Sequence, residues 1–249
     1  MRASDGVTML SISATIMGKT DVIHPTLLWD RNNVILVDTA YPGQLPLVKA
    51  AVEQAGIRFE KLTAVILTHQ DIDHIGNLPA IRKELPQVQI LAHPIEKPYI
   101  QGEKMLVKIT PESIEKAVAA LPQQVPDEWR KAFRSTLENP PRASVDRTIA
   151  GGEELPYSAG LVVIDTPGHT PGHLSLYHQA SKTLIAADAL LISEGQLLLP
   201  EPGLCSDYEL AKESIAKLAS FDIESVICYH GGMITDNVKE RIAKLISSF

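Results

Sequence analysis

The chain has 249 residues, 45% of them hydrophobic, which is enough for a folded core of its own. Its 30 acidic residues outnumber its 23 basic ones, and the formal net charge is -7 with no Lys/Arg-rich run. Nucleic acid and anionic membranes are therefore not expected as partners. No apolar stretch reaches the length of a signal peptide or a membrane span, which predicts a cytoplasmic protein. Cys205 and Cys228 are expected to be reduced thiols.

The first part of the chain alternates between predicted strands and helices. Apolar or alternating stretches predict strands at Val7–Thr15, Thr26–Trp29, Asn33–Asp38, Leu62–Leu67 and Val88–Ala92. Helical spacing of apolar residues predicts helices at Leu45–Gln54 and Ile75–Leu85. This β-α-β alternation indicates an α/β fold.

The pattern changes between residues 94 and 141, where Glu, Lys and Pro become frequent. Two helices are expected within this stretch, at Pro111–Leu121 and Asp127–Leu137. After it the earlier pattern returns, with strands at Leu161–Asp165, His173–His178, Thr183–Ala187 and Ser225–Cys228 and helices at Asp207–Ala219 and the C-terminus. We predict one domain over residues 1–249, with a helical insertion at about 94–141.

The segment LTHQDIDHIG, Leu67–Gly76, concentrates side chains that can bind a metal. His69, Asp71, Asp73 and His74 lie within six residues, directly after a buried strand. Carboxylates and imidazoles are costly to bury without partners, and a bound cation removes that cost. The alternative is a surface loop whose aspartates cap the following helix.

Further metal-capable residues also follow apolar strands. In DTPGHTPG, Asp165–Gly172, two Pro-Gly turns flank His169, and loops at strand ends are where α/β folds place binding groups. Asp38, Asp188 and His230 each end an apolar strand as well. Any one of them could be a helix cap or a satisfied buried polar group, but their coincidence favours one shared site.

In their order and spacing these residues resemble the metallo-β-lactamase superfamily, from about Asn33 to Gly232. The TPGHTPGH stretch at Thr166–His173 is similar to the lactonase and glyoxalase II branches. The resemblance implies an αββα sandwich of two mixed β-sheets flanked by helices, with a metal site along one edge. It also implies two divalent metal ions: His69, Asp71 and His169 would hold the first, Asp73, His74 and His230 the second, and Asp188 would bridge them. Asp38 would lie behind the site and orient a ligand.

Three departures from the family pattern bear on the chemistry. Asp71 stands where the family has His, which favours iron or manganese more than usual, although zinc still suits the His-rich site. No Tyr follows Asp188, unlike in the lactonases that open acyl-homoserine lactones. Asp188 also stands where the main zinc β-lactamases have Cys, so antibiotic hydrolysis is not the first expectation.

The expected activity is hydrolysis of an ester, lactone or thioester bond of a small substrate by a metal-bridged hydroxide, with Asp73 as proton shuttle. The insertion would form a lid, with Tyr99, Met105, Trp129 and Phe133 lining an apolar pocket or simply packing on the sandwich. Phosphodiester hydrolysis, an iron-dependent oxidoreductase of the diiron or sulfur dioxygenase type, and a non-catalytic metal-binding protein are the alternatives. A homodimer is left open.

Overall fold

The computed structural model describes residues 6–16 and 19–249 and has two six-stranded sheets at its centre. In the first sheet, the neighbours from β5 to β8 are parallel, and β1, β4 and β5 are joined by antiparallel pairing. Its strands, in spatial order, are β1 (Gly6–Met9), β4 (Thr26–Trp29), β5 (Val34–Val37), β6 (Ala64–Ile66), β7 (Gln89–Ala92) and β8 (Arg147–Thr148).

The second sheet is built mainly from the last third of the chain. Only β12 and β15 are parallel, and its other neighbours are antiparallel. Its order is β16 (Gly232–Ile234), β15 (Ser225–Cys228), β12 (Thr183–Ala187), β11 (Leu174–His178), β10 (Leu161–Asp165) and β9 (Glu154–Leu155). Two hairpins stand apart from both sheets: β2 (Ile12–Ile16) with β3 (Lys19–Ile23), and β13 (Leu191–Ser193) with β14 (Gln196–Leu198).

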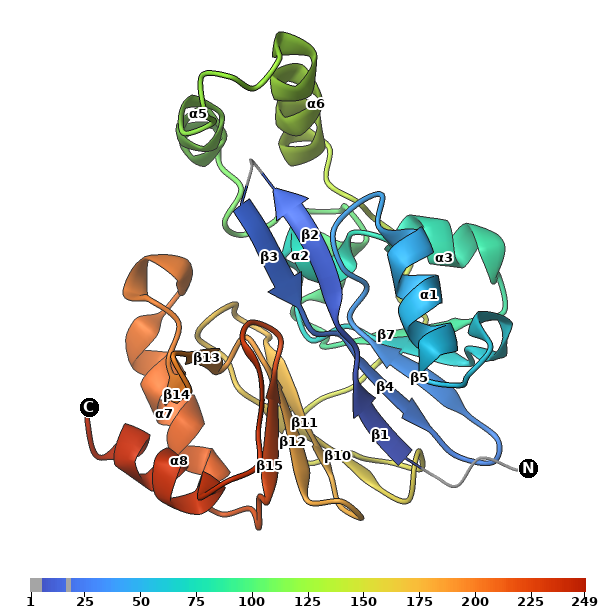
Figure 1. Cartoon of the computed structure of the whole chain (residues 1–249), viewed down its shortest axis with the longest axis vertical. Helices are drawn as coiled ribbons and strands as arrows, with labels where there is room; N and C mark the ends of the chain where they lie inside the picture. The colour runs from blue at the N-terminus through green and yellow to red at the C-terminus, as the bar shows by residue number, and fades with distance from the viewer. Residues whose placement is uncertain (1–5, 17–18) are drawn as a thin grey trace.

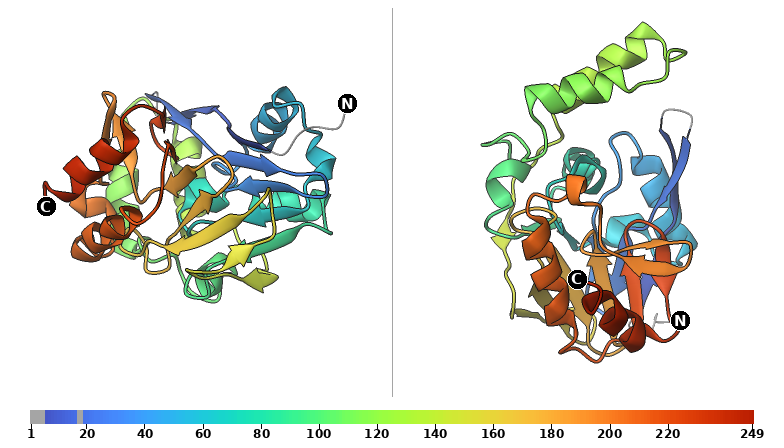
Figure 2. Two further views of the ribbon diagram at one scale, coloured as in Figure 1. Left: turned by 90° about the horizontal axis from the view of Figure 1, so that it is seen from below. Right: turned by 90° about the vertical axis from the view of Figure 1, so that its left-hand side faces the viewer.

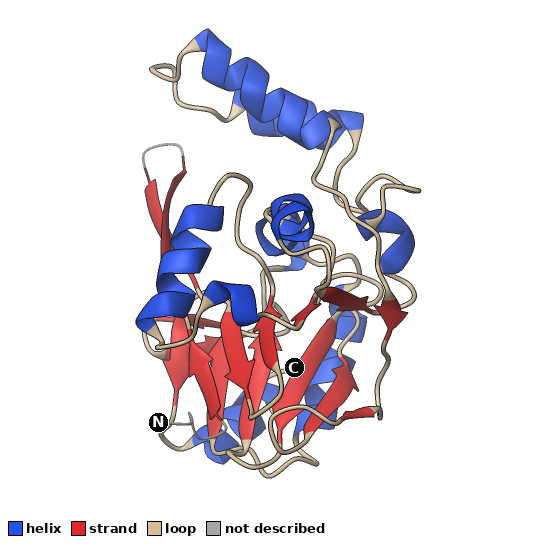
Figure 3. Cartoon of the chain, turned by 90° about the vertical axis from the view of Figure 1, so that its right-hand side faces the viewer, coloured by secondary structure: helices blue, strands red, loops and turns tan. Residues whose placement is uncertain are grey.

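Helices cover the outer face of each sheet, and both sheets are mixed, so the architecture is the expected αββα sandwich (Figures 1 and 3). The first sheet carries α1 (Leu45–Gln54), α2 (Ile72–Ile75) and α3 (Leu78–Glu84), and the second carries α7 (Tyr208–Leu218) and α8 (Val238–Ile246). Short helical turns lie at Phe59–Lys61, Pro202–Leu204 and α4 (Lys97–Ile100). A third buried cluster, which includes Ile35, Val37, Leu174 and Leu176, joins the inner faces of the two sheets.

Two predicted elements are divided in the structure. The strand expected at Val7–Thr15 is divided into β1 and β2 at Leu10 and Ser11. Leu10 still donates its backbone N–H to Pro25 O, but Pro25 has no N–H to return, so the ladder is interrupted there. The helix expected at Ile75–Leu85 begins three residues earlier, as α2, and is interrupted at Gly76 and Asn77. The Asn77 side chain donates to the carbonyls of Thr39 and Tyr41, which fixes this break.

The insertion folds into two helices, α5 (Pro111–Ala119) and α6 (Asp127–Glu138), close to the predicted bounds. Thr110 begins α5 with a reciprocal capping box to Ser113, and Arg134 of α6 pairs with Glu115 of α5. The helical pair stands away from the sandwich, at the end where the β2–β3 hairpin projects (Figures 1 and 2). Within residues 6–16 and 19–249, the helices are too short or too polar to cross a membrane.

Candidate metal centre

The seven predicted ligands converge at one edge of the sandwich, placed there by strand ends and by the short helix α2 that follows β6. His69 follows β6 and begins a loop that leads into α2, which carries Asp73 and His74, while Asp71 is the residue before α2. His169, Asp188 and His230 follow β10, β12 and β15. Both sheets therefore contribute ligands to a single site.

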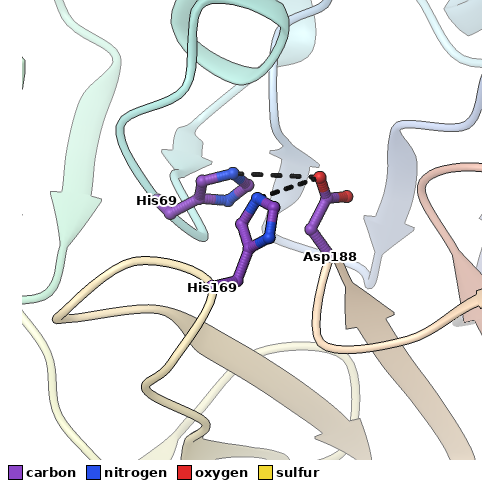
Figure 4. A group of neighbouring side chains, drawn as sticks. All are labelled: His69, His169 and Asp188. Carbon is purple, nitrogen blue, oxygen red and sulfur yellow. Dashed lines mark ion pairs between the residues drawn. The ribbon is translucent and has the colours of Figure 1, made fainter. Parts of the chain in front are cut away.

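Two sets of three side chains each have their ligand atoms within 4.8 Å of one another, the spacing that a shared ion requires. The first is His69, His169 and Asp188 (Figure 4), and the second is Asp73, His74 and His230. In the second set, Asp73 Oδ2 is 3.2 Å from His230 Nε2 and 3.7 Å from His74 Nε2. The second set has the members expected from the sequence. The first has Asp188 beside the two histidines, and the Oδ2 of Asp71 also lies 3.1 Å from His169 Nε2 and 3.3 Å from His69 Nε2.

Asp188 lies between the two sets. Its Oδ2 is 3.4 Å from Nε2 of His169 and 4.0 Å from Nε2 of His69, both in the first set. The same oxygen is 3.5 Å from His74 Nε2 and 3.6 Å from His230 Nε2, in the second. A carboxylate so placed can contact a cation in either position.

The chemistry of this donor set fits a divalent metal. Nε2 of His69, Nε2 of His74 and Oδ1 of Asp188 are buried and make no hydrogen bond to the described residues. Buried polar atoms are normally paired, and leaving them unpaired costs about 1–3 kcal/mol each. Imidazole nitrogens and carboxylate oxygens that converge without partners are what a bound zinc or similar cation satisfies.

Asp38 lies directly behind His74. Its Oδ2 is 2.9 Å from His74 Nδ1 and accepts from Thr68 Oγ1, while its Oδ1 accepts from the Thr68 backbone N–H. The Asp38 backbone has φ 63°, a left-handed conformation that turns the chain at the end of β5. A carboxylate that accepts from Nδ1 leaves Nε2 of His74 free to bind a metal.

Two aromatic residues that the sequence did not single out also support the ligands. His173 is fully buried, and its Nε2 accepts from the backbone N–H of Asp188 at 3.2 Å. The Tyr229 ring lies 3.8 Å from the His74 ring, centre to centre, and its hydroxyl donates to Asp73 O at 2.5 Å. Two features of the sequence could have pointed to these residues: His173 is the second His of TPGHTPGH, and Tyr229 directly precedes His230.

The electrostatics differ among the histidines. Burial and the neighbouring His74 lower the pKa of His69 to about 4, so its imidazole is neutral and able to bind metal. Burial also disfavours the charged form of His74, but Asp188, Asp38 and Asp73 outweigh it and raise its pKa well above the ordinary value. The carboxylates thus create a negative field that a cation would neutralise.

A lysine from the insertion also enters the site. Nζ of Lys108 donates to Asp71 Oδ2 at 2.6 Å and lies 2.8 Å from His169 Nε2. Burial would raise the pKa of Asp71, but His69, His169 and Lys108 together hold it well below the ordinary value. Nothing in the sequence distinguishes Lys108 from the other lysines of the insertion.

Gln70 and Glu96, both fully buried, connect the insertion to the ligand loops. Gln70 Nε2 donates to Glu96 Oε2, and Gln70 Oε1 accepts from the backbone N–H of Val107. Glu96 Oε1 accepts from the backbone N–H of Gly172, in the loop that carries His169. These contacts fix the base of the insertion against the site.

The four residues expected to line a pocket lie at different places. Tyr99 packs against the core of the first sheet, whereas Met105 is 47% exposed. Trp129 and Phe133 lie on α6, in the projecting helical pair, and Trp129 is 72% exposed. The structure does not bring these four side chains together beside the metal ligands.

Comparisons with known families and structures identify the family and the fold. Residues 19–230 match the model of the metallo-β-lactamase superfamily, so the chain belongs to that family. It is 30% identical over 217 residues to "Probable metallo-hydrolase YflN" of Bacillus subtilis, a match over 80% of this chain and 76% of that protein. It is 26% identical to "Probable metallo-hydrolase YqjP" of the same organism, over 80% of this chain and 64% of YqjP.

Solved structures share the fold over nearly the whole chain. A metallo-β-lactamase family protein of Thermus thermophilus superposes with a TM-score of 0.67 at 24% identity, covering 98% of this chain and 79% of that one. A metallo-β-lactamase of Pontibacter korlensis has a TM-score of 0.68 at 14% identity, covering 100% and 98%. The αββα sandwich is thus that of the metallo-β-lactamase fold, and the family and its relatives indicate a metallo-hydrolase.

Proposed function

We propose that this protein is a metal-dependent hydrolase that cleaves an ester, lactone or thioester bond in a small substrate. The observation that carries the proposal is the convergence of unpaired imidazole and carboxylate atoms at the sandwich edge. A divalent cation held there would act as a Lewis acid and acidify a bound water, so that the chain need not supply a nucleophile.

Access to the ligands is uneven, which suggests where substrate enters. The side chains of His69 and His74 are fully buried, whereas that of His230 is 33% exposed and those of Asp71 and Asp73 are 19% and 17% exposed. A substrate would therefore approach across His230 and the two aspartates.

Asp73 is suited to move a proton. Its carboxylate lies at the exposed side of the site, and although burial would raise its pKa, His74 and His230 keep the pKa below the ordinary value. An ionised carboxylate at this position can accept a proton from water and pass it to the leaving group, a role typically worth about 10²–10⁴-fold in rate.

The test is a panel of p-nitrophenyl esters, lactones, thioesters and phosphodiesters, assayed with Zn²⁺ or Mn²⁺ and again after chelation. We expect chelator-sensitive turnover of an acyl substrate, and a loss of about 100-fold or more in kcat for Asp73→Asn. Asp30→Asn is the matched control, because Asp30 lies at the turn between β4 and β5, where it accepts from Asn32 and Asn33.

Other results would favour the alternative functions. Turnover of phosphodiesters alone would indicate phosphoryl chemistry. Stoichiometric iron with visible absorption and oxygen-dependent turnover would indicate an oxidoreductase. Metal binding without turnover of any substrate class would indicate a binding protein.

A further inference from the structure

The Lys108 ammonium lies among the atoms of the first predicted metal position. It is hydrogen-bonded to Asp71 Oδ2 at 2.6 Å and lies 2.8 Å from His169 Nε2. The same Asp71 oxygen is 3.1 Å from His169 Nε2 and 3.3 Å from His69 Nε2. A positive charge of this chain therefore already faces two of the three side chains expected to bind the first ion.

The departure of Asp71 from the family pattern fits this arrangement. A neutral His at position 71 would offer an ammonium group no opposite charge, whereas the Asp71 carboxylate accepts directly from the Lys108 ammonium. Charge-assisted hydrogen bonds of this kind are short and about twice as strong as neutral ones. Asp71 and Lys108 thus form a complementary pair.

The position of Lys108 is fixed by contacts on both sides of it. Leu106 is 2% exposed and belongs to the core of the first sheet, and the Val107 backbone N–H donates to Gln70, next to His69. The Ser113 hydroxyl donates to the Lys108 carbonyl at 2.9 Å. The backbone around Lys108 is therefore fixed by packing and hydrogen bonds, although the Lys108 side chain is 26% exposed.

The second metal position, at Asp73, His74 and His230, has no lysine beside it among the described residues. In the part of the chain that the structure describes, Asp73 pairs only with His74 and His230, and no lysine or arginine faces it. Nε2 of His74 makes no hydrogen bond there. Within residues 6–16 and 19–249, the second set therefore has no lysine ammonium beside it of the kind that faces Asp71 and His169.

We propose that the Lys108 ammonium takes the place of the first metal ion, so that the protein holds one divalent cation, bound by Asp73, His74 and His230. Asp188 Oδ2 lies between that cation position and His169, which contacts the ammonium. The proposal goes beyond the hydrolase function and changes the expected two ions to one. It concerns stoichiometry and holds whichever bond is cleaved.

A second cation at the first position would have to displace Lys108. Metal ligands lie about 2.0–2.2 Å from zinc, so an ion bound to both Asp71 and His169 would occupy the space of an ammonium that contacts the same two atoms. Two positive charges so close also repel each other.

The experiment is metal stoichiometry, measured without any substrate. Chelator-stripped protein is dialysed to equilibrium against micromolar Zn²⁺, and separately Mn²⁺, and bound metal is measured by elemental analysis. We expect one ion per chain for wild type and two for Lys108→Met, which keeps the apolar stem and removes the charge. Lys116→Met, at an exposed position of α5, is the matched control and should bind one ion.

A second variant keeps the proposal testable if Lys108→Met does not fold. Asp71→Asn should leave one bound ion with little change in affinity, whereas His230→Ala should lose that ion. Two ions per wild-type chain would overturn the proposal, as would folded Lys108→Met that still binds one. Failure of all substrates would defeat the proposed hydrolase without changing these stoichiometries.

Discussion

At the scale of single residues, Asp38 acts on the site through His74. Asp38→Asn replaces one carboxylate oxygen with an amide N–H donor, so Thr68 or His74 loses its acceptor. Loss of such an outer partner typically lowers metal affinity about 10–100-fold. Competition of the protein with a chromophoric zinc chelator would measure this loss.

Asp30→Asn serves as the control for this affinity measurement, because Asp30 follows β4 and its side chain contacts Asn32, Asn33 and Ser158. It should change metal affinity less than about twofold. Equal losses in both variants would mean that the effect of Asp38 is general destabilisation and not orientation of His74.

Glu96 makes stability depend on pH in a direction opposite to that of most carboxylates. Burial raises its pKa above the ordinary value of 4.5, more than the hydrogen bonds from Gln70 and Gly172 lower it. As pH rises, the unfolded chain therefore loses this proton first, and the folded state binds more protons in the window above pH 4.5. Stability contributed by neutral Glu96 falls through that window.

Glu96→Gln removes this titration. At about pH 4 the variant should be less stable than wild type by about 1 kcal/mol, because its amide has a single acceptor oxygen and cannot accept from both Gln70 and Gly172. The deficit should shrink or reverse by about pH 7, as measured by urea unfolding at each pH. Glu240→Gln, at an exposed position of α8, should show no such trend. A deficit that grows with pH would show that ionised Glu96 is stabilising.

At the scale of elements, the α2 turn is positioned by the close approach of Gly76 to the segment that follows Asp38. A Cβ at position 76 would lie 2.3 Å from Ala40 O and 2.4 Å from Pro42 N, both backbone atoms that cannot rotate away. We expect Gly76→Ala to lower the free energy of unfolding by about 1–3 kcal/mol, the usual cost of overpacking. It should also weaken metal binding, since Asp73 and His74 lie on α2.

Gly203→Ala is the matched control, because a Cβ there meets no atom within 4 Å. It should change the free energy of unfolding by less than about 0.5 kcal/mol in denaturant titrations. If Gly76→Ala were equally harmless, the segment at residues 40–42 would have to move freely relative to α2.

Elements with strong local patterns could be predicted from the sequence, and those that depend on tertiary contacts could not. The helix at Leu45–Gln54 and the strands at Leu161–Asp165 and Thr183–Ala187 have the predicted bounds, because their apolar periodicity is unbroken. The break between α2 and α3 depends on Asn77 bonding to distant carbonyls. The short strands β8, β9, β13, β14 and β16 have two or three residues each, too few to show a period.

The same division applies to the site. The side chains that end strands, such as His69, Asp188 and His230, could be predicted to meet because neighbouring strand ends share an edge. Lys108 could not, because its approach depends on how the insertion is fixed by Gln70 and Ser113. The placement of the residues expected to line a pocket could not be predicted for a similar reason: amphipathic spacing on α6 does not say whether Trp129 faces the site or solvent.

At the scale of the whole molecule, the site joins two halves of the sandwich. Asp73 and His74 come from the half that contains the first sheet, whereas Asp188 and His230 come from the half that contains the second. The inner faces of the sheets already share a buried apolar cluster. A bound cation adds a connection at the edge, where unpaired ligand atoms and like charges otherwise oppose closure.

Metal removal should therefore lower the melting temperature. At a free metal concentration about 100 times its Kd, binding to the folded state alone adds about 2.7 kcal/mol, which corresponds to a Tm increase of about 5–10 °C for a chain of this size. Calorimetry of chelator-stripped and metal-loaded protein would measure it. His230→Ala should lose the increase, whereas Met233→Ala, a 49% exposed neighbour on β16, should keep it. If His230→Ala kept the increase in melting temperature, the stabilising ion would have to bind away from His230 and from the edge of the sandwich.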